Sequence, residues 1–415
     1  MTVEAHLADW IRNTPEGREA ESILRACVHC GFCNATCPTY QLTGDELDGP
    51  RGRIYQIKRL LEGETPGAST QLHLDRCLTC RNCETTCPSG VDYGHLVDIG
   101  RATMAQRLPR SGAQRAQRGL LRFALTRRWL FAPAVRIGRA LRGVLPSALR
   151  AKLPPARDAG KWPRGAHTRK VLLLNGCAQP ALMPGIDAAT ARVLDRCGIE
   201  AVVAANSGCC GALDFHLDAH SAAQAKARRN IDAWLPQLDA RVEAIVINAS
   251  GCSAMVKDYA HLLRADPDYA DKARRIVAAT RDLAEFLPPL LQPLGARRQL
   301  ALPQTLRRVA LHPPCTLQHA QKISGAVENA LTALGAELAP VDEAHLCCGS
   351  AGTYSILQAE FSQRLRDRKL DNLQRHRPAM ILSANIGCLA HLEGAAQVPV
   401  RHWIEWVDAV LARQD

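Results

Sequence analysis

The sequence has few aromatic residues and no long apolar run. Phenylalanine, tryptophan and tyrosine make up 4% of the 415 residues, so aliphatic side chains must form most of any core. No stretch of about 20 apolar residues occurs, and a membrane-spanning helix needs one. The polar, acidic opening (MTVEAHLADWIRNTPEGREAE) lacks the basic and apolar regions of a secretory signal. These absences predict a cytoplasmic chain, and 415 residues with 47% hydrophobic content are enough for two or three packed domains.

Glycine-rich phosphate-binding motifs are also absent. Neither G-x-G-x-x-G nor G-x-x-x-x-G-K-[ST] occurs, so no site for a flavin, a nicotinamide or a nucleotide is recognisable. A two-electron oxidation of a substrate needs an organic cofactor or a suitable metal. If the chain takes part in such a reaction, we expect the substrate to be oxidised on a partner chain.

Acidic residues are missing between Asp98 and Asp158, a stretch that contains 13 arginines and Lys152. The formal net charge of +12 therefore describes this segment rather than the whole surface. We expect Pro133 to divide the segment into two helices. Basic residues recur at helical spacing on both sides of that proline, and apolar residues lie between them: Arg115, Arg118, Arg122, Arg136, Arg139 and Arg142, with Leu120, Leu121, Ala124, Leu125, Leu130 and Phe131.

Three interpretations of this basic stretch are open. A basic amphipathic helix can lie on an anionic membrane. It can equally dock a partner protein, or pack its apolar face on the core and leave its charges in solvent. Nucleic-acid binding is disfavoured, because the stretch has Trp129 and few other aromatic residues and no nucleic-acid motif.

Cysteine is abundant, with 17 residues, and the cysteines occur in tight groups. An odd number of cysteines in a reducing compartment favours metal or redox use over disulfides. Two runs, at residues 27–38 and 77–88, fit C-x2-C-x2-C-x3-C-P, the pattern of bacterial ferredoxins with two [4Fe–4S] clusters. The fourth cysteine of each run ligates the other cluster. The pattern therefore predicts two ligand sets: Cys27, Cys30, Cys33 and Cys87; and Cys77, Cys80, Cys83 and Cys37.

Zinc is the alternative to iron–sulfur clusters at these runs. Zinc sites usually contain paired C-x2-C units without a third cysteine and a trailing Cys-Pro, so the pattern disfavours zinc. Pro38 and Pro88 turn the chain after each trailing cysteine. Arg51 and Arg53, between the two runs, could offset the negative charge of the clusters, although exposed arginines are common.

The second half of the chain is an internal repeat. RKVLLLNGC, ending at Cys177, matches RRVALHPPC, ending at Cys315, and a Cys-Cys-Gly sequence follows each. Each copy ends in Gly-Cys after an apolar run. The two sets are Cys177, Cys209, Cys210 and Cys252; and Cys315, Cys347, Cys348 and Cys388.

Each copy predicts strands that alternate with helices, and hence a parallel sheet. The cysteines follow the strands, and loops beyond the carboxyl ends of parallel strands are where such sheets bind ligands. Gly211 and Gly349 permit the unusual backbone of a tight cage. Cys197 is interpreted as a core residue, and His312 and His319 as ordinary polar contacts.

The repeated motif resembles the cysteine-rich CCG domain found in heterodisulfide reductases, in one of the subunits of glycerol-3-phosphate dehydrogenase and in lactate-utilisation proteins. In some members each motif holds a non-cubane [4Fe–4S] cluster and ends in C-x2-C. Both copies here end in a single cysteine, Cys252 or Cys388. The resemblance therefore leaves a four-ligand cluster or no cluster in each copy, so the chain has two [4Fe–4S] clusters and room for one or two more.

Nearly the whole chain resembles the iron–sulfur subunits of bacterial glycolate oxidase, through ILRACVHCGFCNATCPTYQLTGDELDGPRGRIYQIK, LDRCLTCRNCETTCPSG, HLCCGSAGTY and ANIGC. The resemblance implies electron transfer from an FAD-containing flavoprotein subunit, which oxidises a 2-hydroxy acid, towards the quinone of the cytoplasmic membrane. It implies peripheral association with that membrane and no catalytic residue on this chain. The alternatives are a thiol–disulfide enzyme like heterodisulfide reductase, or the related subunit of a lactate or glycerol-3-phosphate dehydrogenase.

The expected fold class is an α-rich, two-cluster ferredoxin-type domain followed by duplicated α/β CCG domains with parallel sheets. The expected boundaries are 1–98 for the two-cluster domain, 99–165 for the basic segment and its Pro-rich linker, 166–295 for the first CCG domain and 296–415 for the second.

Overall fold

The structure is a computed structural model that describes residues 5–146, 150, 152–296 and 302–413. It divides into two compact units. Unit 1 comprises residues 1–119 and 345–366, and unit 2 comprises residues 120–344 and 367–415. Within the described ranges, the helices fall short of the length and apolar character that crossing a bilayer requires. The four-part division expected from the sequence stays a proposal.

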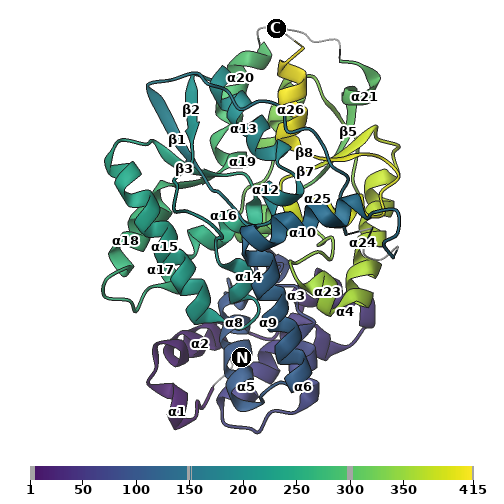
Figure 1. Ribbon diagram of the computed structural model, residues 1–415. Helices are drawn as coiled ribbons and strands as arrows, with labels where there is room; N and C mark the ends of the chain where they lie inside the picture. The colour runs from purple at the N-terminus through teal and green to yellow at the C-terminus, as the bar shows by residue number, and fades with distance from the viewer. Residues whose placement is uncertain (1–4, 147–149, 151, 297–301, 414–415) are drawn as a thin grey trace. The chain divides into compact units, whose positions relative to one another are not determined.

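Unit 1 is built from helices joined by the cysteine-containing loops (Figure 1). Its N-terminal elements are α1 (Asp9–Arg12), α2 (Pro15–Ala26), α3 (Phe32–Ala35), α4 (Pro38–Thr43), η1 (Glu46–Asp48), α5 (Pro50–Leu61), α6 (Ala68–Asp75), α7 (Asn82–Thr86) and α8 (Tyr93–Arg107). Helix α23 (Tyr354–Leu357) also belongs to it. The expected short helices and cysteine loops are thus present, and α8 continues beyond the expected boundary at residue 98.

Local sequence signals explain why these helices begin where they do. In α2, the Thr14 side chain accepts a hydrogen bond from the Gly17 amide, and proline occupies the first helical position. Helix α5 also begins with proline and buries Ile57 and Leu61. These side chains pack with Leu96 of α8 in one apolar core that also contains several of the cysteines.

Residues 345–366 complete unit 1 although they are distant in sequence. Tyr354 Oη donates to Arg76 O at 3.1 Å, and the Arg76 guanidinium lies 4.8 Å from the centre of the Phe361 ring. Asn82 Nδ2 donates to His345 O at 3.2 Å. This late segment therefore packs directly beside the second cysteine run.

Unit 2 contains two four-stranded sheets, and every strand pair in them is parallel. The first sheet has the order β2-β1-β3-β4, and the second has the order β6-β5-β7-β8. The strands are β1 (Arg169–Leu173), β2 (Ile199–Val202), β3 (Ala244–Ile247), β4 (Thr280–Asp282), β5 (Arg308–His312), β6 (Glu337–Leu338), β7 (Met380–Ser383) and β8 (Val400–His402). The predicted duplication is confirmed, and β4 and β8 add a fourth strand to each copy.

Helices connect the strands of each copy (Figure 1). Buried strand residues such as Leu172 and Ile245 pack against Trp234 of α15. The connecting elements are α12 (Gln179–Leu182), α13 (Gly185–Arg196), α14 (Ala212–Phe215), α15 (His220–Asp239), α16 (Ser250–Lys257), α17 (Tyr259–Leu262), α18 (Ala270–Ala279), α19 (Leu283–Phe286), α20 (Pro288–Ala296), α21 (Gln304–Arg307), η2 (Thr316–Ala320), α22 (Ala326–Ala333), α24 (Ala359–Gln374) and α25 (Ile386–Glu393). Helix α26 (Trp403–Leu411) follows the last strand, β8.

The basic segment forms α9 (Gly112–Thr126) and α10 (Arg128–Ala140). The expectation that Pro133 separates two helices is wrong, because Pro133 lies inside α10 and the break falls at Arg127, whose backbone is extended. At the sixth position of α10 the proline removes the backbone hydrogen bond to the carbonyl of Trp129, and burial of Val135 anchors the following turn. Residues 147–149 and 151 of the segment lie outside the described residues.

Candidate metal centres

The two N-terminal cysteine runs fold into equivalent loops. His29 and Gly31 in the first loop, and Thr79 and Arg81 in the second, all have positive φ angles of 52 to 84°. Three of these residues are not glycine, and a left-handed conformation costs such a residue roughly 1–2 kcal/mol. Because both loops accept this cost at the same motif positions, the sharp winding that brings successive cysteines to one side is a shared structural requirement of the two runs.

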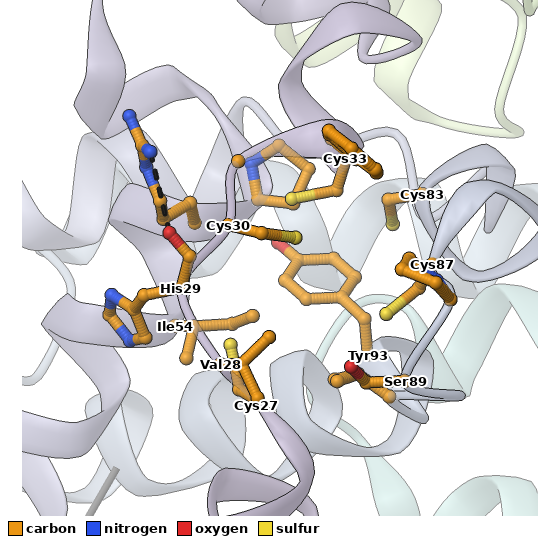
Figure 2. Close-up of a pocket in the computed structure, with 16 residues that line it drawn as sticks. Cys27, Val28, His29, Cys30, Cys33, Ile54, Cys83, Cys87, Ser89 and Tyr93 are labelled. Atoms are coloured by element: carbon orange, nitrogen blue, oxygen red, sulfur yellow. Dashed lines mark hydrogen bonds between the residues drawn. The ribbon is translucent and has the colours of Figure 1, made fainter. Parts of the chain in front are cut away.

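The first cysteine group consists of Cys27, Cys30, Cys33 and Cys87. These residues line one pocket, and Figure 2 shows their side chains around it together with Tyr93. Burial, with the neighbouring thiols of Cys27, Cys87 and Cys30, raises the pKa of Cys33 to about 12. The trailing cysteine of the second run thus lies with the first three cysteines of the first run.

The second cysteine group consists of Cys37, Cys77, Cys80 and Cys83, which line a second pocket with Arg53 and Tyr93. Burial, and then the thiols of Cys80, Cys77 and Cys37, raise the pKa of Cys83 well above its ordinary value. Tyr93 Oη donates to Cys77 Sγ at 3.6 Å. The trailing cysteine of the first run thus lies with the other three cysteines of the second run.

Polar contacts hold the two runs in this crossed arrangement. Thr36 Oγ1 and Thr86 Oγ1, each next to a trailing cysteine, are 3.1 Å apart. Asn82 Nδ2 donates to Thr36 O at 3.0 Å. Burial disfavours the thiolate forms of Cys27, Cys33 and Cys83, and bound metal ions would compensate the negative charge of these thiolates. Each group of four sulfurs therefore fits a [4Fe–4S] cluster.

The two arginines between the runs have different surroundings. Arg51 is partly exposed, lines the first pocket, and forms an ion pair with Glu46 at 2.6 Å. Arg53 is 1% exposed and donates to His73 O at 2.7 Å and to Thr39 Oγ1 at 3.1 Å.

Buried charge next to the second cysteine group is predominantly positive. Asp48, fully buried, lies 3.5 Å from Arg53 Nη2 and 2.9 Å from Arg76 Nη1, so one carboxylate faces two guanidinium groups. Burial opposes the charge of Arg53, but the nearby thiols of Cys77 and Cys37 raise the pKa of Arg53 above its ordinary value. The sequence pattern was only a weak indication of this role, because it does not show that one arginine is buried.

The four cysteines of the first repeat lie together in unit 2. The thiol of Cys209 is hydrogen-bonded by those of Cys177 and Cys210, which lowers the pKa of Cys209 to about 3. A hydrogen bond with Cys209, followed by burial, raises the pKa of Cys177, and hydrogen bonds with Cys209 and Cys252 raise the pKa of Cys210. Four cysteine sulfurs gathered in this way are a chemically suitable set of metal ligands.

Gly211 shapes this cysteine loop. It has φ of 92°, and a Cβ atom at this position would lie 3.1 Å from Ala223 O, in the backbone of α15. The Tyr259 hydroxyl donates to Cys210 O at 2.8 Å and accepts from Asn230 Nδ2 at 3.1 Å. The glycine role expected from the sequence is therefore present as a left-handed turn and a close approach to a helix.

The cysteines of the second repeat are distributed over both units. Cys347 and Cys348 are buried in unit 1, and Cys315 and Cys388 belong to unit 2. Gly349 has φ of 84°, and its carbonyl accepts a hydrogen bond of 2.7 Å from Ser362 Oγ.

Three further residues were singled out from the sequence. Cys197 directly follows α13 and is partly buried, and burial raises its pKa to about 11. His319 is buried in η2. His312 is buried at the end of β5, within hydrogen-bonding distance of Ser383, and a ring nitrogen of it lies within 4.8 Å of Cys388 Sγ. Sequence reasoning treated His312 as a polar contact and missed its proximity to a repeat cysteine.

Two family models match the chain. A 4Fe-4S dicluster domain matches residues 23–91, and a cysteine-rich domain (CCG) matches residues 171–257 and again residues 309–393. These matches confirm the expected fold class and show that the chain has iron–sulfur cofactors. The two-cluster domain and the duplication are therefore supported by the family matches as well as by the structure.

Two of the similar proteins match nearly the full length of the chain. It is 51% identical over 414 residues to the glycolate oxidase iron-sulfur subunit of Escherichia coli (strain K12), with 99% of this chain and 100% of that protein covered. The probable glycolate oxidase iron-sulfur subunit of Bacillus subtilis (strain 168) is 32% identical over 423 residues, covering 95% and 93%. Lactate utilization protein A of Geobacillus thermodenitrificans (strain NG80-2) is 29% identical over 231 residues, covering 54% of this chain and 90% of that protein.

Proposed function

Because the chain belongs to the family of glycolate oxidase iron–sulfur subunits, we propose that it relays electrons from an FAD-containing partner subunit, which oxidises glycolate, towards membrane quinone. The observation that carries the proposal is the pair of crossed four-cysteine groups in unit 1. Iron–sulfur clusters supply one-electron redox capacity when bound, and their potentials depend on exposure and neighbouring charge.

The proposed ligands follow the two groups. Cys27, Cys30, Cys33 and Cys87 hold the first cluster, and Cys37, Cys77, Cys80 and Cys83 hold the second. The proximity of the four sulfurs in each group supports this ligand assignment. In this proposal the side chains of this chain bind the clusters, and the hydroxy acid is oxidised on the partner subunit. Substrate oxidation on the partner is consistent with the absence of a recognisable flavin or nicotinamide motif.

The first cysteine group is the more accessible of the two. Cys30 is exposed, and the neighbouring Val28 and Phe32 are 43% and 62% exposed. All four residues of the second group are buried. We therefore assign electron exchange with the partner to the first cluster, and storage of the electron to the second.

A third cluster in the first repeat is part of the proposal. Cys177, Cys209, Cys210 and Cys252 form a contiguous set of sulfurs at the carboxyl ends of strands β1, β2 and β3. The second repeat, with Cys315, Cys347, Cys348 and Cys388, is proposed to hold a further cluster. The third cluster is tested by iron and sulfide analysis of the full chain and of a Cys210→Ser variant. Equal iron content in the two proteins would show that the first repeat holds no cluster.

Membrane docking is assigned to an exposed apolar face of α10 and the turn after it. Trp129, Ile137, Leu141 and Val144 recur at helical spacing and are 70%, 60%, 50% and 80% exposed. Exposed Arg136 lies beside them, and acidic residues are missing from this stretch. An apolar stripe with an aromatic residue and flanking arginines fits the interface of an anionic bilayer.

The stripe on α9 is a weaker docking surface than the sequence suggested. Arg118 forms an ion pair with Asp75 at 3.3 Å, and Arg122 forms one with Asp214 at 3.0 Å. Sedimentation with anionic and neutral vesicles would separate the candidates. Trp129→Ser with Ile137→Ser should abolish binding to anionic vesicles, and Arg115→Glu should weaken it. A double variant that binds vesicles normally but loses its partner subunit would make this face a protein interface.

The relay function is tested by single-turnover reduction. The chain and its flavoprotein partner are mixed anaerobically with glycolate or with lactate, and cluster reduction is followed by electron spin resonance. Reduction of the clusters by glycolate supports the proposal, and preferential reduction by lactate would reassign the substrate. If glycolate reduces the flavin while all clusters stay oxidised, this chain is not the electron acceptor.

A further inference from the structure

His312 and Ser383 form a buried polar pair between two central strands. They are register partners at the carboxyl ends of β5 and β7, and His312 Nδ1 lies 3.0 Å from Ser383 Oγ. Their exposed fractions are 1% and 0%. Because buried polar groups cost free energy unless they are paired, such a pair at the centre of an apolar sheet calls for a reason.

The first repeat shows that the fold does not need this pair. Aligning Cys177 with Cys315 places Leu174 opposite His312, and aligning Cys252 with Cys388 places Ile247 opposite Ser383. Leu174 and Ile247 are buried in the apolar core of the first repeat. The same sheet position thus accepts two aliphatic side chains, so packing alone does not explain the histidine and serine.

The second ring nitrogen of His312 is left without a partner. Nε2 is buried and has no hydrogen-bond partner among the described residues. Donation from Nδ1–H to Ser383 would leave a lone pair on Nε2, and this is how metal-binding histidines are usually held: one nitrogen fixed by a hydrogen bond, the other on the metal. A ring nitrogen of His312 and Cys388 Sγ already lie within 4.8 Å of each other.

We propose that His312 is an iron ligand of the second repeat, binding through Nε2 alongside Cys388. Ser383 is its positioning residue, since it fixes the tautomer that leaves Nε2 free to bind. The proposal rests on the further cluster proposed for the second repeat, and it makes the two repeats chemically different. Mixed cysteine and histidine ligation is established in iron–sulfur chemistry, where replacing thiolate by neutral imidazole raises the reduction potential.

The experiment uses the full chain, purified anaerobically with its clusters and with ¹⁵N-labelled histidine. Pulsed electron spin resonance of the reduced protein detects nitrogen nuclei coupled directly to a cluster. We expect an imidazole coupling that changes with the isotope and disappears in His312→Leu, the residue that the first repeat has at this position. Leu174→Val, in the other repeat, is the matched control and should retain the coupling.

A second variant keeps the test decisive if His312→Leu does not fold. Ser383→Ala preserves the imidazole but removes its hydrogen bond, and it should weaken the coupling or shift the potential of that cluster. Iron in the second repeat without a histidine coupling, or a coupling that survives in His312→Leu, would overturn the assignment of His312 alone. Equal iron content in the unsubstituted chain and in Cys388→Ser would show that the second repeat holds no iron. That result would refute the further cluster and the role of His312, but it would not contradict the proposed relay through the first two clusters. Zinc in place of iron would also overturn the proposal.

Discussion

Replacing Gly211 by alanine should destabilise the cysteine loop of the first repeat. Gly211 has φ of 92°, beyond the range that alanine tolerates in the left-handed region. The added Cβ would lie 3.1 Å from Ala223 O and 3.3 Å from Ala223 Cα. Both atoms belong to the backbone of α15, whose position is fixed by the burial of Trp234 and Ile231.

The magnitude follows from two costs. A left-handed conformation costs a residue with a Cβ atom roughly 1–2 kcal/mol. Forcing a methyl group against a packed backbone costs roughly 1–3 kcal/mol. Together they give an expected loss of about 2–5 kcal/mol, and in a unit of this size each kcal/mol lowers the melting temperature by roughly 2–4 °C.

Gly208→Ala is the matched control in the same loop. Gly208 has an ordinary φ, and a Cβ atom there would meet nothing within 4 Å. Thermal unfolding by circular dichroism, with iron analysis of each sample, should show a loss for Gly211→Ala and a change within about 0.5 kcal/mol for Gly208→Ala. Equal melting temperatures for the two variants would refute the reasoning, because the left-handed turn and the close approach would then have no energetic consequence.

Three other predictions concern clusters and pH. Cys37→Ser should perturb the cluster of the second run, and if spin resonance shows Cys37→Ser and Cys30→Ser altering the same single cluster, the crossed assignment is wrong. Arg53→Gln should lower the potential of the second cluster, because Arg53 lines the pocket of that cysteine group and its positive charge favours the reduced, more negative state. Unit charges within roughly 10 Å of each other, at an effective dielectric constant of about 20, interact by roughly 1.7 kcal/mol or more, which is over tenfold in the equilibrium. The control, Arg51→Gln, removes a charge already paired with Glu46 and should change the potential less, so equal shifts would contradict the argument. Burial lowers the pKa of His402, whose neutral ring caps α26, to about 3. Stability should therefore be highest above about pH 6.5 and should fall by about 1.4 kcal/mol per pH unit as the pH drops below this value, because the unfolded chain then binds a proton that the folded chain does not. A His402→Asn variant with the same dependence of stability on pH, measured by denaturant titration, would disprove this.

The sequence predicted the parts of the molecule that depend on spacing. The two cysteine runs differ by a constant offset and carry a known ligand order, so the crossed groups could be anticipated from residues such as Cys37 and Cys87. The repeat was visible because apolar runs and Cys-Cys-Gly recur together. These features are local, so they can be recognised in the sequence without the three-dimensional structure.

Features that depend on tertiary packing were not predictable in the same way. Nothing in the sequence marks Arg53 as buried and Arg51 as only partly exposed, because both occur in one short helix and only the fold decides which face of the helix is buried. His312 resembles an ordinary polar residue in the sequence because its register partner, Ser383, is 71 residues away. Pro133 predicts a helix break by its residue type, whereas packing of the following turn maintains the helix around it.

The discontinuity of unit 1 has a consequence during synthesis of the protein. Arg76 is covered by Tyr354 and Phe361, which are made about 240 residues after residue 119. At roughly 5–20 residues per second, a ribosome needs roughly 12 to 50 s to cover that distance. During this interval the eight N-terminal thiols have been translated but their unit lacks its final segment. The nascent chain therefore presents its cysteines to cluster-delivery proteins, and to oxidants, well before the fold can close over them.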